Sequence, residues 1–466
     1  MEKNMTSSFI SREPVFNQEG FIGRAAELAW VADLLGRPSP QNCNFIGEPR
    51  MGKTSLLYQV YDRQLGLPPG VQGLYVWLRL AELPDYRPVT FWRAMLSRLL
   101  AEAGRAAPDV PTDAQDVFDE LDEAIEELVE EAGYGRIIFL IDDFDLLKSG
   151  IGSRDLDWLR SLATRYGETI AFVISSGEPV VELEDRLRAA EESAAQVSLF
   201  ANTLNDRWLA LLPPEEAEQL CRETAAAEKQ SPLADEEIAF LLAEAGRHPA
   251  LLKIAAAYLF EARQYETGPE MLENVRQDVR LDRHVVWLCR QLWQRRSPAE
   301  QAVLDQVLRG EAGPSAGSGQ VPDRITLRHL TRHLGLLEKR AGEVALFADA
   351  FAYWVEQLLN VPRDTAVPAP PVTDELLYDS QTRMVRVDGR EVRLTSLEGR
   401  LLAYFLAHKN EVCTVENLLE DVWGPGKSRS VVEKAVNRLR TKVERDPKRP
   451  RFILSARGEG YLLRLP

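Results

Sequence analysis

The sequence predicts an α/β fold in which helices cover both faces of a parallel sheet, joined to a mainly helical region and a smaller basic domain. Three observations support this prediction. Short apolar runs alternate with helical stretches between residues 20 and 200, a proline-rich segment at 361–372 sets off the last part of the chain, and positive charge is concentrated in that last part. These features predict several domains with separate tasks.

The bulk composition is that of a globular protein. The 466 residues are 45% hydrophobic and 27% charged, which leaves room for roughly two to four domains. No apolar run reaches the roughly 18–20 residues of a membrane span, and the N-terminus lacks the apolar run of a signal peptide. We therefore expect a cytoplasmic protein that does not enter a membrane. The cysteines lie far apart and are expected to be reduced, buried thiols; they are Cys43, Cys221, Cys289 and Cys413.

Charge is distributed unevenly along the chain. The whole sequence carries −16, which by itself argues against a nucleic-acid partner. Residues 425–466, however, contain twelve Lys or Arg and four Asp or Glu, a net charge of +8, so the remainder carries −24. This asymmetry indicates that the C-terminal segment has a task of its own.

Four apolar runs predict the strands of the parallel sheet. They are NFIG at 44–47, LYVWLRL at 74–80, RIIFLIDD at 136–143 and IAFVISS at 170–176. Continuous apolar strands separated by helices are typical of a parallel sheet buried on both faces. The acidic run at 116–133 predicts one of these helices, because its apolar residues recur at helical spacing; they are Val117, Leu121, Ile125 and Leu128.

The rest of the chain predicts further segments. Residues from 201 onward have a helical pattern, interrupted by a loop rich in Gly, Ser and Pro at 311–322. The prolines that follow predict a stiff spacer. The predicted organisation is a loose tail at 1–19, an α/β domain at 20–200, a helical segment at 201–275, a second mostly helical domain at 276–362, a linker at 363–372 and a basic domain at 373–466.

A glycine-containing loop follows the first predicted strand. Residues 47–54 fit the phosphate-loop pattern G-x-x-x-x-G-K-[ST], with a strand before them and a helix after them. The glycines let backbone N–H groups surround a phosphate, and the helix N-terminus adds the positive end of its dipole. The residues expected to bind nucleotide are Gly47, Glu48, Pro49, Arg50, Met51, Gly52, Lys53, Thr54 and Ser55.

Side chains at strand ends support the same ligand. Lys53 is expected to reach the β- and γ-phosphates of ATP in a catalytic role, and the Thr54 hydroxyl to bind Mg²⁺. Asp142 and Asp143 end the third strand, at the sheet edge where ligands of open α/β sheets bind. We expect Asp142 to hold Mg²⁺ through water and Asp143 to orient the attacking water; a helix-capping acidic pair is the alternative. Ser175 is a candidate sensor of the γ-phosphate, although serine after a strand is also ordinary turn chemistry.

Five segments in a fixed order resemble the STAND group of signal-transduction ATPases, which are relatives of the AAA+ ATPases. They are FIGRAAEL at 21–28, the phosphate loop, the Asp142-Asp143 strand end, the Ser175-Ser176 strand end and GRHPALL at 246–252. The resemblance implies a P-loop NTPase domain, a helical lid at 201–275 and a winged-helix-like domain at 276–362, with ATP or ADP and Mg²⁺ as ligands. It makes Ile22, Gly23, Arg24 and Pro249 candidate nucleotide contacts; for Pro249 an ordinary helix start is equally expected.

Two positions depart from that family. Ala25 replaces the usual acidic residue after Gly-Arg, and Ser176 is followed by Gly177 and Glu178 in place of the arginine often found after this strand. The second departure leaves the source of a γ-phosphate arginine open, and a neighbouring subunit is one candidate source. It favours slow hydrolysis that serves as a switch between ADP-closed and ATP-open forms.

Residues 373–466 combine a small apolar pattern with a basic helix. Alternation around Asp388-Gly389 predicts a hairpin, Thr395 and Glu398 form a capping box, and a second hairpin with its tip at 457–460 closes the chain. A helix at 429–445 would bury one apolar stripe and expose polar side chains that can reach base edges in the major groove, a solvated basic face being the alternative. The residues expected to bind DNA are Arg429, Ser430, Lys434, Asn437, Arg438, Thr441, Lys442 and, at the hairpin tip, Arg457.

This segment is similar over its full length to the OmpR/PhoB-type winged helix. The matching landmarks are Leu394-Thr395, Glu398, Leu401-Leu402, Val422-Trp423-Gly424, Leu439-Arg440, Lys442 and Arg457-Gly458-x-Gly460-Tyr461. The resemblance implies that 429–445 is the recognition helix, that 456–461 is the wing, and that double-stranded DNA is the partner of 373–466. Arg440 has a structural role as its alternative, because it follows the core residue Leu439. A phospho-receiver domain normally precedes such domains, and here the ATPase takes its place.

Together these features predict a nucleotide-switched, DNA-binding transcription regulator. ATP would favour an open state able to form homo-oligomers, and hydrolysis would reset it. Two other functions stay open on the sequence alone. One is an ATP-driven DNA-remodelling or loading ATPase of the initiator or transposition kind. The other is a defence-type STAND sensor, for which no nuclease, protease or membrane effector motif is visible.

Overall fold

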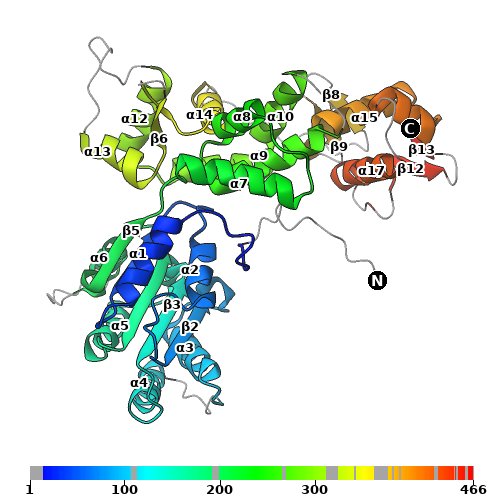
Figure 1. Cartoon of the computed structure of the whole chain (residues 1–466). Helices are drawn as coiled ribbons and strands as arrows, with labels where there is room; N and C mark the ends of the chain where they lie inside the picture. The colour runs from blue at the N-terminus through cyan, green and yellow to red at the C-terminus, as the bar shows by residue number, and fades with distance from the viewer. Residues whose placement is uncertain are drawn as a thin grey trace. The chain divides into compact units, whose positions relative to one another are not determined.

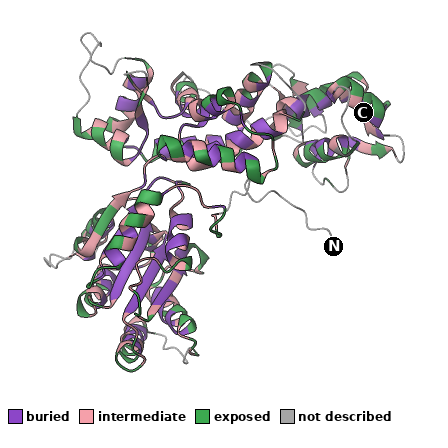
Figure 2. Cartoon of the chain, viewed as in Figure 1, coloured by how far each residue is buried: buried purple, intermediate pink, exposed green. Residues whose placement is uncertain are grey.

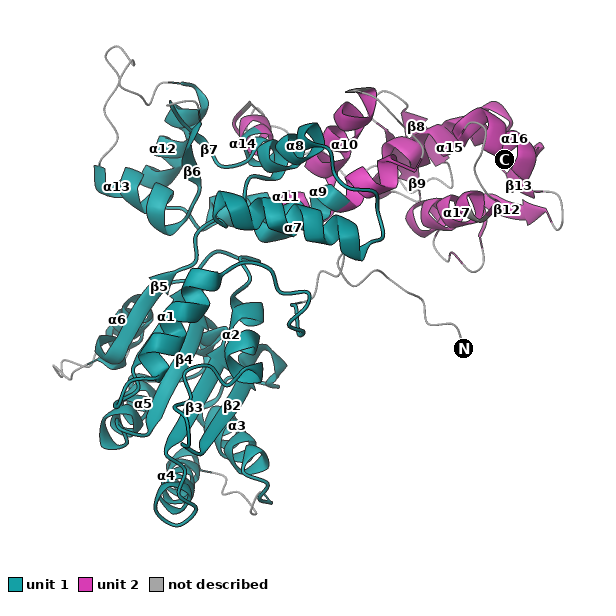
Figure 3. Ribbon diagram, viewed as in Figure 1, with its two compact units in different colours: residues 1–256, 288–352 teal, residues 257–287, 353–466 magenta. Residues whose placement is uncertain are grey.

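Two compact units make up the chain in the computed structural model (Figure 1 and Figure 3). Unit 1 comprises residues 1–256 and 288–352, and unit 2 comprises residues 257–287 and 353–466. The structure describes residues 14–106, 113–190, 199–264, 269–310, 324–340, 343–360, 376–379, 383–387, 390–423, 429–444, 447, 450–456 and 460–464. The predicted linker at 363–372 and the predicted loop at 311–322 lie outside these ranges, and the predicted domain boundaries stay predictions.

Within its described residues, unit 1 is built around a five-stranded parallel sheet. The strands are β1 (Asn42–Ile46), β2 (Gly73–Arg79), β3 (Arg136–Asp142), β4 (Ile170–Ser176) and β5 (Leu204–Trp208), in the spatial order β2-β3-β4-β1-β5. The four strands predicted from apolar runs are confirmed, and β1, β3 and β4 are buried along their whole length. The expectation of helix from residue 201 is wrong for β5, which pairs with β1. Its sequence is polar because it lies at the sheet edge, so no apolar run marks it.

Helices cover both faces of this sheet, as predicted, and Figure 2 shows the buried strands between them. On one face, α1 (Ala25–Leu35) and α2 (Lys53–Asp62) pack with Phe45, Tyr75 and Leu140. The other face is covered by α3 (Pro88–Glu102), α4 (Ala114–Glu130), α5 (Ser153–Arg165) and α6 (Val180–Ala190), with the short helices η1 (Leu80–Glu82), η2 (Phe144–Ser149) and η3 (Phe200–Thr203). The predicted acidic helix is α4, and its four apolar residues named above are buried.

Further helices and one hairpin complete unit 1. They are α7 (Pro214–Ala227), α8 (Asp235–Ala245), α12 (Pro298–Leu308), α13 (Arg324–Arg328), η4 (His329–His333), β6 (Leu337–Arg340) and β7 (Glu343–Leu346). The helices α9 (Pro249–Ala262), α11 (Arg283–Gln294) and α14 (Asp349–Asn360) each contribute residues to both units. Gly246 has φ 59°, and a Cβ there would collide with the backbone carbonyl of Phe347. Glycine is therefore required where the GRHPALL segment meets the residues after β7.

Unit 2 contains α10 and the C-terminal domain. Its elements are α10 (Pro269–Leu281), β8 (Leu376–Asp379), β9 (Met384–Val387), β10 (Arg390–Arg393), α15 (Ser396–Ala407), β11 (Val412–Thr414), α16 (Val415–Leu418), η5 (Leu419–Trp423), α17 (Arg429–Val443), β12 (Ile453–Ala456) and β13 (Gly460–Leu463). Both predicted hairpins are confirmed, because β9 pairs with β10 and β12 pairs with β13 in antiparallel register. The predicted turn at 388–389 and tip residues 457–459 lie outside the described residues.

The core of the C-terminal domain forms between α15, α17 and the strands. The capping box is confirmed: the Glu398 N–H donates to Thr395 Oγ1 at 3.3 Å, and the Thr395 N–H donates to Glu398 Oε2 at 2.9 Å. The apolar stripe of α17 is completely buried; it consists of Val432, Val436, Leu439 and Val443. Burying this stripe directs the polar face of α17 outward. Among the described residues, no helix has both the length and the apolar character needed to cross a bilayer.

Candidate functional site

The phosphate loop connects the end of β1 to the start of α2. Gly52 has φ 92°, which lies in the left-handed region that glycine adopts readily, and a Cβ at this position would meet no atom within 4 Å. Lys53 begins α2, so the positive end of the helix dipole lies at the loop. The Gly47 N–H donates to the Ser176 carbonyl at 3.1 Å and ties the loop to the end of β4. The loop therefore presents an open backbone surface at the carboxyl edge of the sheet.

The Lys53 ammonium is held by the loop itself. Its Nζ donates to the carbonyls of Gly47 at 2.8 Å and of Glu48 at 3.3 Å. Burial lowers the pKa of Lys53, and the nearby carboxylates of Asp143 and Asp145 oppose this shift. Carbonyl oxygens are neutral acceptors, so a phosphate that offered charged oxygens would form stronger hydrogen bonds to the same ammonium.

The end of β3 places two carboxylates beside this lysine. Asp142 is buried, and its Oδ1 accepts a hydrogen bond of 2.6 Å from the Ser175 hydroxyl, which itself accepts from the Asp143 N–H at 3.0 Å. Burial and then the charge of Asp142 raise the pKa of Asp143 to about 6. Asp143 precedes η2, but its side chain makes no capping hydrogen bond there. In this structure the Ser175 hydroxyl joins the Asp142 carboxylate to the backbone of Asp143.

A buried ion pair joins the phosphate loop to the residues after α11. Arg296 Nη2 donates to Glu48 Oε1 at 2.6 Å, and the two side chains are only 6% and 2% exposed. Arg296 Nε and Glu48 Oε2 have no hydrogen-bond partner among the described residues. Buried polar atoms normally have partners, so these two mark a place where a further polar group can bind. Glu48 was predicted from the sequence as a residue of the loop, and Arg296 was not predicted as a residue of the site.

A second arginine after α11 lies at the end of β4. Arg295 Nη2 donates to the Gly177 carbonyl at 3.1 Å, and the charge of Arg295 contributes to the lowered pKa of Lys53. A Cβ at position 177 would collide with this guanidinium, so the glycine lets the arginine approach. The sequence departed from the STAND pattern by lacking an arginine after β4. The structure places Arg295 at that point from a distant part of the chain.

The 21–28 segment packs against the phosphate loop. Arg24 is 3% exposed, and its Nη2 donates to the Met51 carbonyl at 3.1 Å. The backbone N–H groups of Arg24 and Ala25 donate to the Glu216 carboxylate at 2.8 and 3.2 Å. Glu216, from α7, thus supplies a carboxylate at the start of α1, where Ala25 replaces the usual acidic residue. Arg24 is held in the left-handed region with φ 63° by these contacts.

The start of α9 lies at the same loop. His248 is buried next to the backbone of Pro49 and near Arg24, and burial lowers the pKa of its imidazole to about 3, so the ring is neutral. Pro249 is the first residue of α9, the position expected of an ordinary helix start. The short-range pattern around His248 does not reveal its buried position beside the loop.

The residues at this edge fit a nucleotide with its cation. The lysine, the glycine loop and the two arginines supply positive groups for phosphate oxygens, and Thr54 and Asp142 supply oxygen ligands of the kind Mg²⁺ prefers. Within the part of the chain that the structure describes, no group of three or more His, Cys, Asp or Glu side chains is placed to hold a metal by itself.

The polar face of α17 forms the second candidate site. Lys434 and Asn437 are exposed, and Arg429 forms a 3.7 Å ion pair with Glu433 on the same helix. Arg438 is 55% exposed and pairs with Glu261. The Thr441 hydroxyl donates to the Asn437 carbonyl at 2.9 Å. This row has the charge and the amide group that contact DNA phosphates and base edges.

Three of the predicted DNA-binding positions differ from the exposed row on α17. Lys442 donates to Glu398 Oε2 at 2.6 Å, so its ammonium joins α17 to the start of α15. Arg457 and the side chain of Ser430 lie outside the described residues. Arg440 is buried and donates to the Ile453 carbonyl at 2.8 Å, which is the structural alternative predicted for it.

Comparison with known families identifies the C-terminal part. Residues 389–463 match the family model described as "Transcriptional regulatory protein, C terminal". The C-terminal part of the chain is an OmpR/PhoB-type winged-helix domain. The probable transcriptional regulator ycf27 of Porphyra purpurea is 38% identical over 91 residues, which are 19% of this chain and 37% of the relative. The protein of the same name from Guillardia theta is 36% identical, over 19% of this chain and 36% of the relative. The chain thus spans little more than a third of these curated relatives.

Solved structures resemble both parts of the chain. A Walker-type ATPase of Pyrococcus abyssi is 13% identical and covers 75% of this chain and 99% of its own, with a TM-score of 0.48. The RstA DNA-binding domain of Klebsiella pneumoniae, in complex with the RstA box, is 28% identical and covers 20% of this chain and 95% of its own, with a TM-score of 0.18. Unit 1 is assigned the P-loop NTPase fold from its own features, the strand order, the loop after β1 and the acidic end of β3.

Proposed function

We propose that this protein is a nucleotide-switched, DNA-binding transcription regulator of the STAND ATPase type, active in the cytoplasm. The observation that supports the proposal most strongly is the carboxyl edge of the sheet. There, Lys53, Asp142 and Arg295 come together at a phosphate loop, in a chain that also carries a winged-helix domain. Each half of the proposed function thus has its own group of residues.

The nucleotide would bind with its phosphates at the loop. Lys53 would exchange its two carbonyl partners for β- and γ-phosphate oxygens, and the loop N–H groups would donate to the same phosphates. Mg²⁺, when bound, would neutralise phosphate charge, held by the Thr54 hydroxyl and through water by Asp142. Asp143 would orient the attacking water, and Ser175 would fix the Asp142 carboxylate and the backbone N–H of Asp143.

The two arginines after α11 give this site a means of telling ATP from ADP. Both lie in unit 1, and the Arg295 guanidinium has only the Gly177 carbonyl as a partner among the hydrogen bonds described, so this side chain would be able to turn towards a γ-phosphate. Arg296 is bound to the loop through Glu48 and would follow any movement of that loop. We propose that ATP hydrolysis is slow and resets the protein, and that ATP favours a state able to form homo-oligomers.

The winged-helix domain would hold double-stranded DNA through α17. Lys434 and Arg429 would contact phosphates, and Asn437 and Arg438 would contact base edges. Arg457, at the tip of the wing, is predicted to make a further contact, with the DNA backbone or the minor groove. Repeated contacts in an oligomer would raise the overall affinity through effective concentration.

Selection of bound duplexes from a random pool tests this function. The full chain is incubated with the pool in the presence of ADP or of a non-hydrolysable ATP analogue, and bound DNA is sequenced. A regulator should enrich one sequence motif, and the enrichment should differ between the two nucleotides. No enrichment, together with ATPase activity that any DNA stimulates equally, would favour a remodelling or loading ATPase.

A further inference from the structure

Within unit 2, the recognition helix α17 contacts the end of α9, a helix that precedes it by more than 160 residues. Arg438 of α17 forms an ion pair with Glu261 in the last turn of α9, 177 residues earlier in the sequence. The two side chains keep 55% and 29% of their surface exposed. Arg438 belongs to the polar row that faces away from the core, so this contact uses a side chain that would otherwise be free for a partner.

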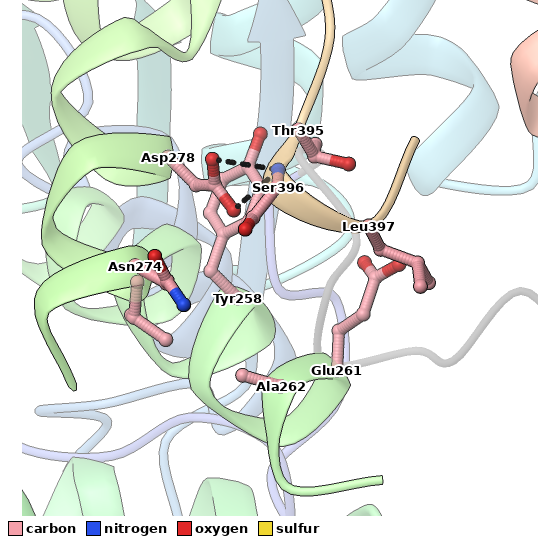
Figure 4. A pocket seen from close by; sticks show the side chains of 9 residues that line it. Tyr258, Glu261, Ala262, Asn274, Asp278, Thr395, Ser396 and Leu397 are labelled. Carbon is pink, nitrogen blue, oxygen red and sulfur yellow. Dashed lines mark hydrogen bonds between the residues drawn. The ribbon is translucent and has the colours of Figure 1, made fainter. Parts of the chain in front are cut away.

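A second acidic side chain fastens the start of α15. Asp278 of α10 accepts hydrogen bonds from the Ser396 N–H at 3.2 and 3.3 Å (Figure 4). It also accepts a hydrogen bond from Arg383 Nη1 at 2.9 Å. Ser396 is the first residue of α15, so the carboxylate lies at the positive end of that helix. The neighbouring Gln277 accepts from Arg383 Nη2 at 2.9 Å. Asp278 and Arg383 are each only 12% exposed, which indicates a packed contact.

A small pocket lies beside the contact of Asp278 with the start of α15. Tyr258, Asn274 and Asp278 line it from α9 and α10, while Ser396 and Leu397 line it from α15, as Figure 4 shows. Burial raises the pKa of Asp278 to about 6 and also raises the pKa of Glu261. Both carboxylates have thus lost water on one side, and arginines from the C-terminal domain take its place.

We propose that Glu261, Gln277 and Asp278 form a docking surface that holds the winged-helix domain in competition with DNA. This inference rests on the proposed function of α17 as the DNA-binding helix. The surface offers carboxylate oxygens to the same guanidinium that a duplex would contact through its phosphates or base edges. Arg438 cannot serve both partners at once, so DNA must displace Glu261.

The connection of this surface to the nucleotide site is covalent. Glu261 lies in the last turn of α9, and α9 begins at Pro249, directly after the buried His248 at the phosphate loop. An α-helix transmits a movement of one end to the other because its backbone hydrogen bonds make it stiff. A nucleotide-dependent shift of the start of α9 would therefore move Glu261 relative to Arg438.

The test compares DNA affinity of the full chain before and after the docking surface is neutralised. Glu261→Gln and the double variant with Asp278→Asn are titrated with a labelled duplex at low salt, with ADP bound. We expect about threefold tighter binding for Glu261→Gln, as for loss of a partly exposed ion pair, and about tenfold for the double variant. Glu270→Gln on α10 is the matched control, since it removes one negative charge at an exposed residue, and its affinity should equal that of the wild type.

Hydrogen exchange gives a second measurement that does not depend on DNA. In the double variant, the amide of Ser396 should exchange faster, because a neutral amide oxygen replaces the charged carboxylate that accepts its hydrogen bond, while amides in the core of α17 should not change. Unchanged exchange at Ser396 would overturn the docking contact. Faster exchange without tighter DNA binding would overturn the competition with DNA.

The outcomes also separate this inference from the nucleotide switch. Tighter binding by the variants, combined with wild-type affinity that ignores nucleotide, would support the docking surface and contradict the switch. Nucleotide-dependent affinity of the wild type, without tighter DNA binding by the variants, would support the switch and overturn the docking surface. If both the nucleotide switch and the docking surface are correct, the double variant binds DNA tightly with ADP and with the ATP analogue alike.

Discussion

The carboxyl edge of the sheet in unit 1 and the polar face of α17 in unit 2 handle charge in opposite ways. At the sheet edge, charged side chains are buried and held by partners within the chain, as in the pair of Arg296 with Glu48. On α17, Lys434 and Asn437 are exposed to solvent. The first arrangement suits a small ligand that replaces internal partners, and the second suits a large partner that covers an existing surface.

This difference decides what a substitution should do in each region. Loss of one buried partner leaves an unpaired charge in a dry environment, which has a large and local cost. Loss of one exposed charge removes one of many weak contacts with DNA. It therefore lowers DNA affinity slightly and alters the dependence of that affinity on salt.

The largest effect is expected where the ion pair of the sheet edge is broken on one side. Arg296→Met should lower the free energy of unfolding by about 3–5 kcal/mol, because it leaves Glu48 buried and unpaired. Chemical denaturation measures this. The double variant Arg296→Met with Glu48→Met should recover most of the loss, and Arg290→Met, at an exposed position of α11, should stay near the wild type. Equal stability of Arg296→Met and Arg290→Met would show that the buried pair does not form.

The next effect concerns the lysine of the phosphate loop. Lys53→Ala should weaken ATP binding by about 100-fold or more, because in the proposed function its ammonium would leave the Gly47 carbonyl and bind two phosphates. Calorimetric titration with ATP and Mg²⁺ measures it, with the exposed Lys148→Ala as the control. ATP affinity that does not change in Lys53→Ala would refute the phosphate-loop assignment.

A smaller effect is expected from the arginine at the end of β4. Arg295→Ala should reduce the preference for ATP over ADP by about tenfold and leave ADP affinity nearly unchanged, since only ATP carries the γ-phosphate that the guanidinium would contact. Competition titrations with the two nucleotides measure the ratio. An equal loss for both nucleotides would assign Arg295 a general role in holding the loop.

The smallest single effect is expected on the exposed helix. Lys434→Ala should weaken binding to specific and unrelated duplexes alike by a few-fold, and it should reduce the slope of log affinity against log salt concentration by about 1. Fluorescence anisotropy at several salt concentrations measures this. A wild-type affinity that does not respond to salt would contradict a basic-helix interface altogether.

The two regions also differ in how much of them the sequence could predict. The capping box of Thr395 with Glu398, the buried stripe of α17 and the glycine loop depend on residues within a few positions of one another, and each is confirmed as a local structure. Periodicity and short motifs contain this information. In the described part of the C-terminal domain, the two hairpins, the start of α15 and the buried stripe of α17 were predictable in this way, whereas β8 and β11 were not.

The partners at the sheet edge could not be predicted by the same reasoning. Arg296 lies 248 residues from Glu48, and Arg295 lies 118 residues from Gly177. Nothing in the residues around these arginines marks them, because the contact arises only when the chain folds. The edge strand β5 was not predicted either, because an edge strand need not be apolar and its sequence contains no apolar run. The ion pair of Glu261 with Arg438 is another contact of this kind.

The most direct test of the central claim is the affinity of the full chain for its selected duplex in three nucleotide states. Anisotropy titrations without nucleotide, with ADP and with a non-hydrolysable ATP analogue give this value. Affinity with the analogue is expected to exceed affinity with ADP by about tenfold, within the range of ordinary coupling free energies. Equal affinity in all three states would contradict the claim that the nucleotide site of unit 1 governs DNA binding by unit 2.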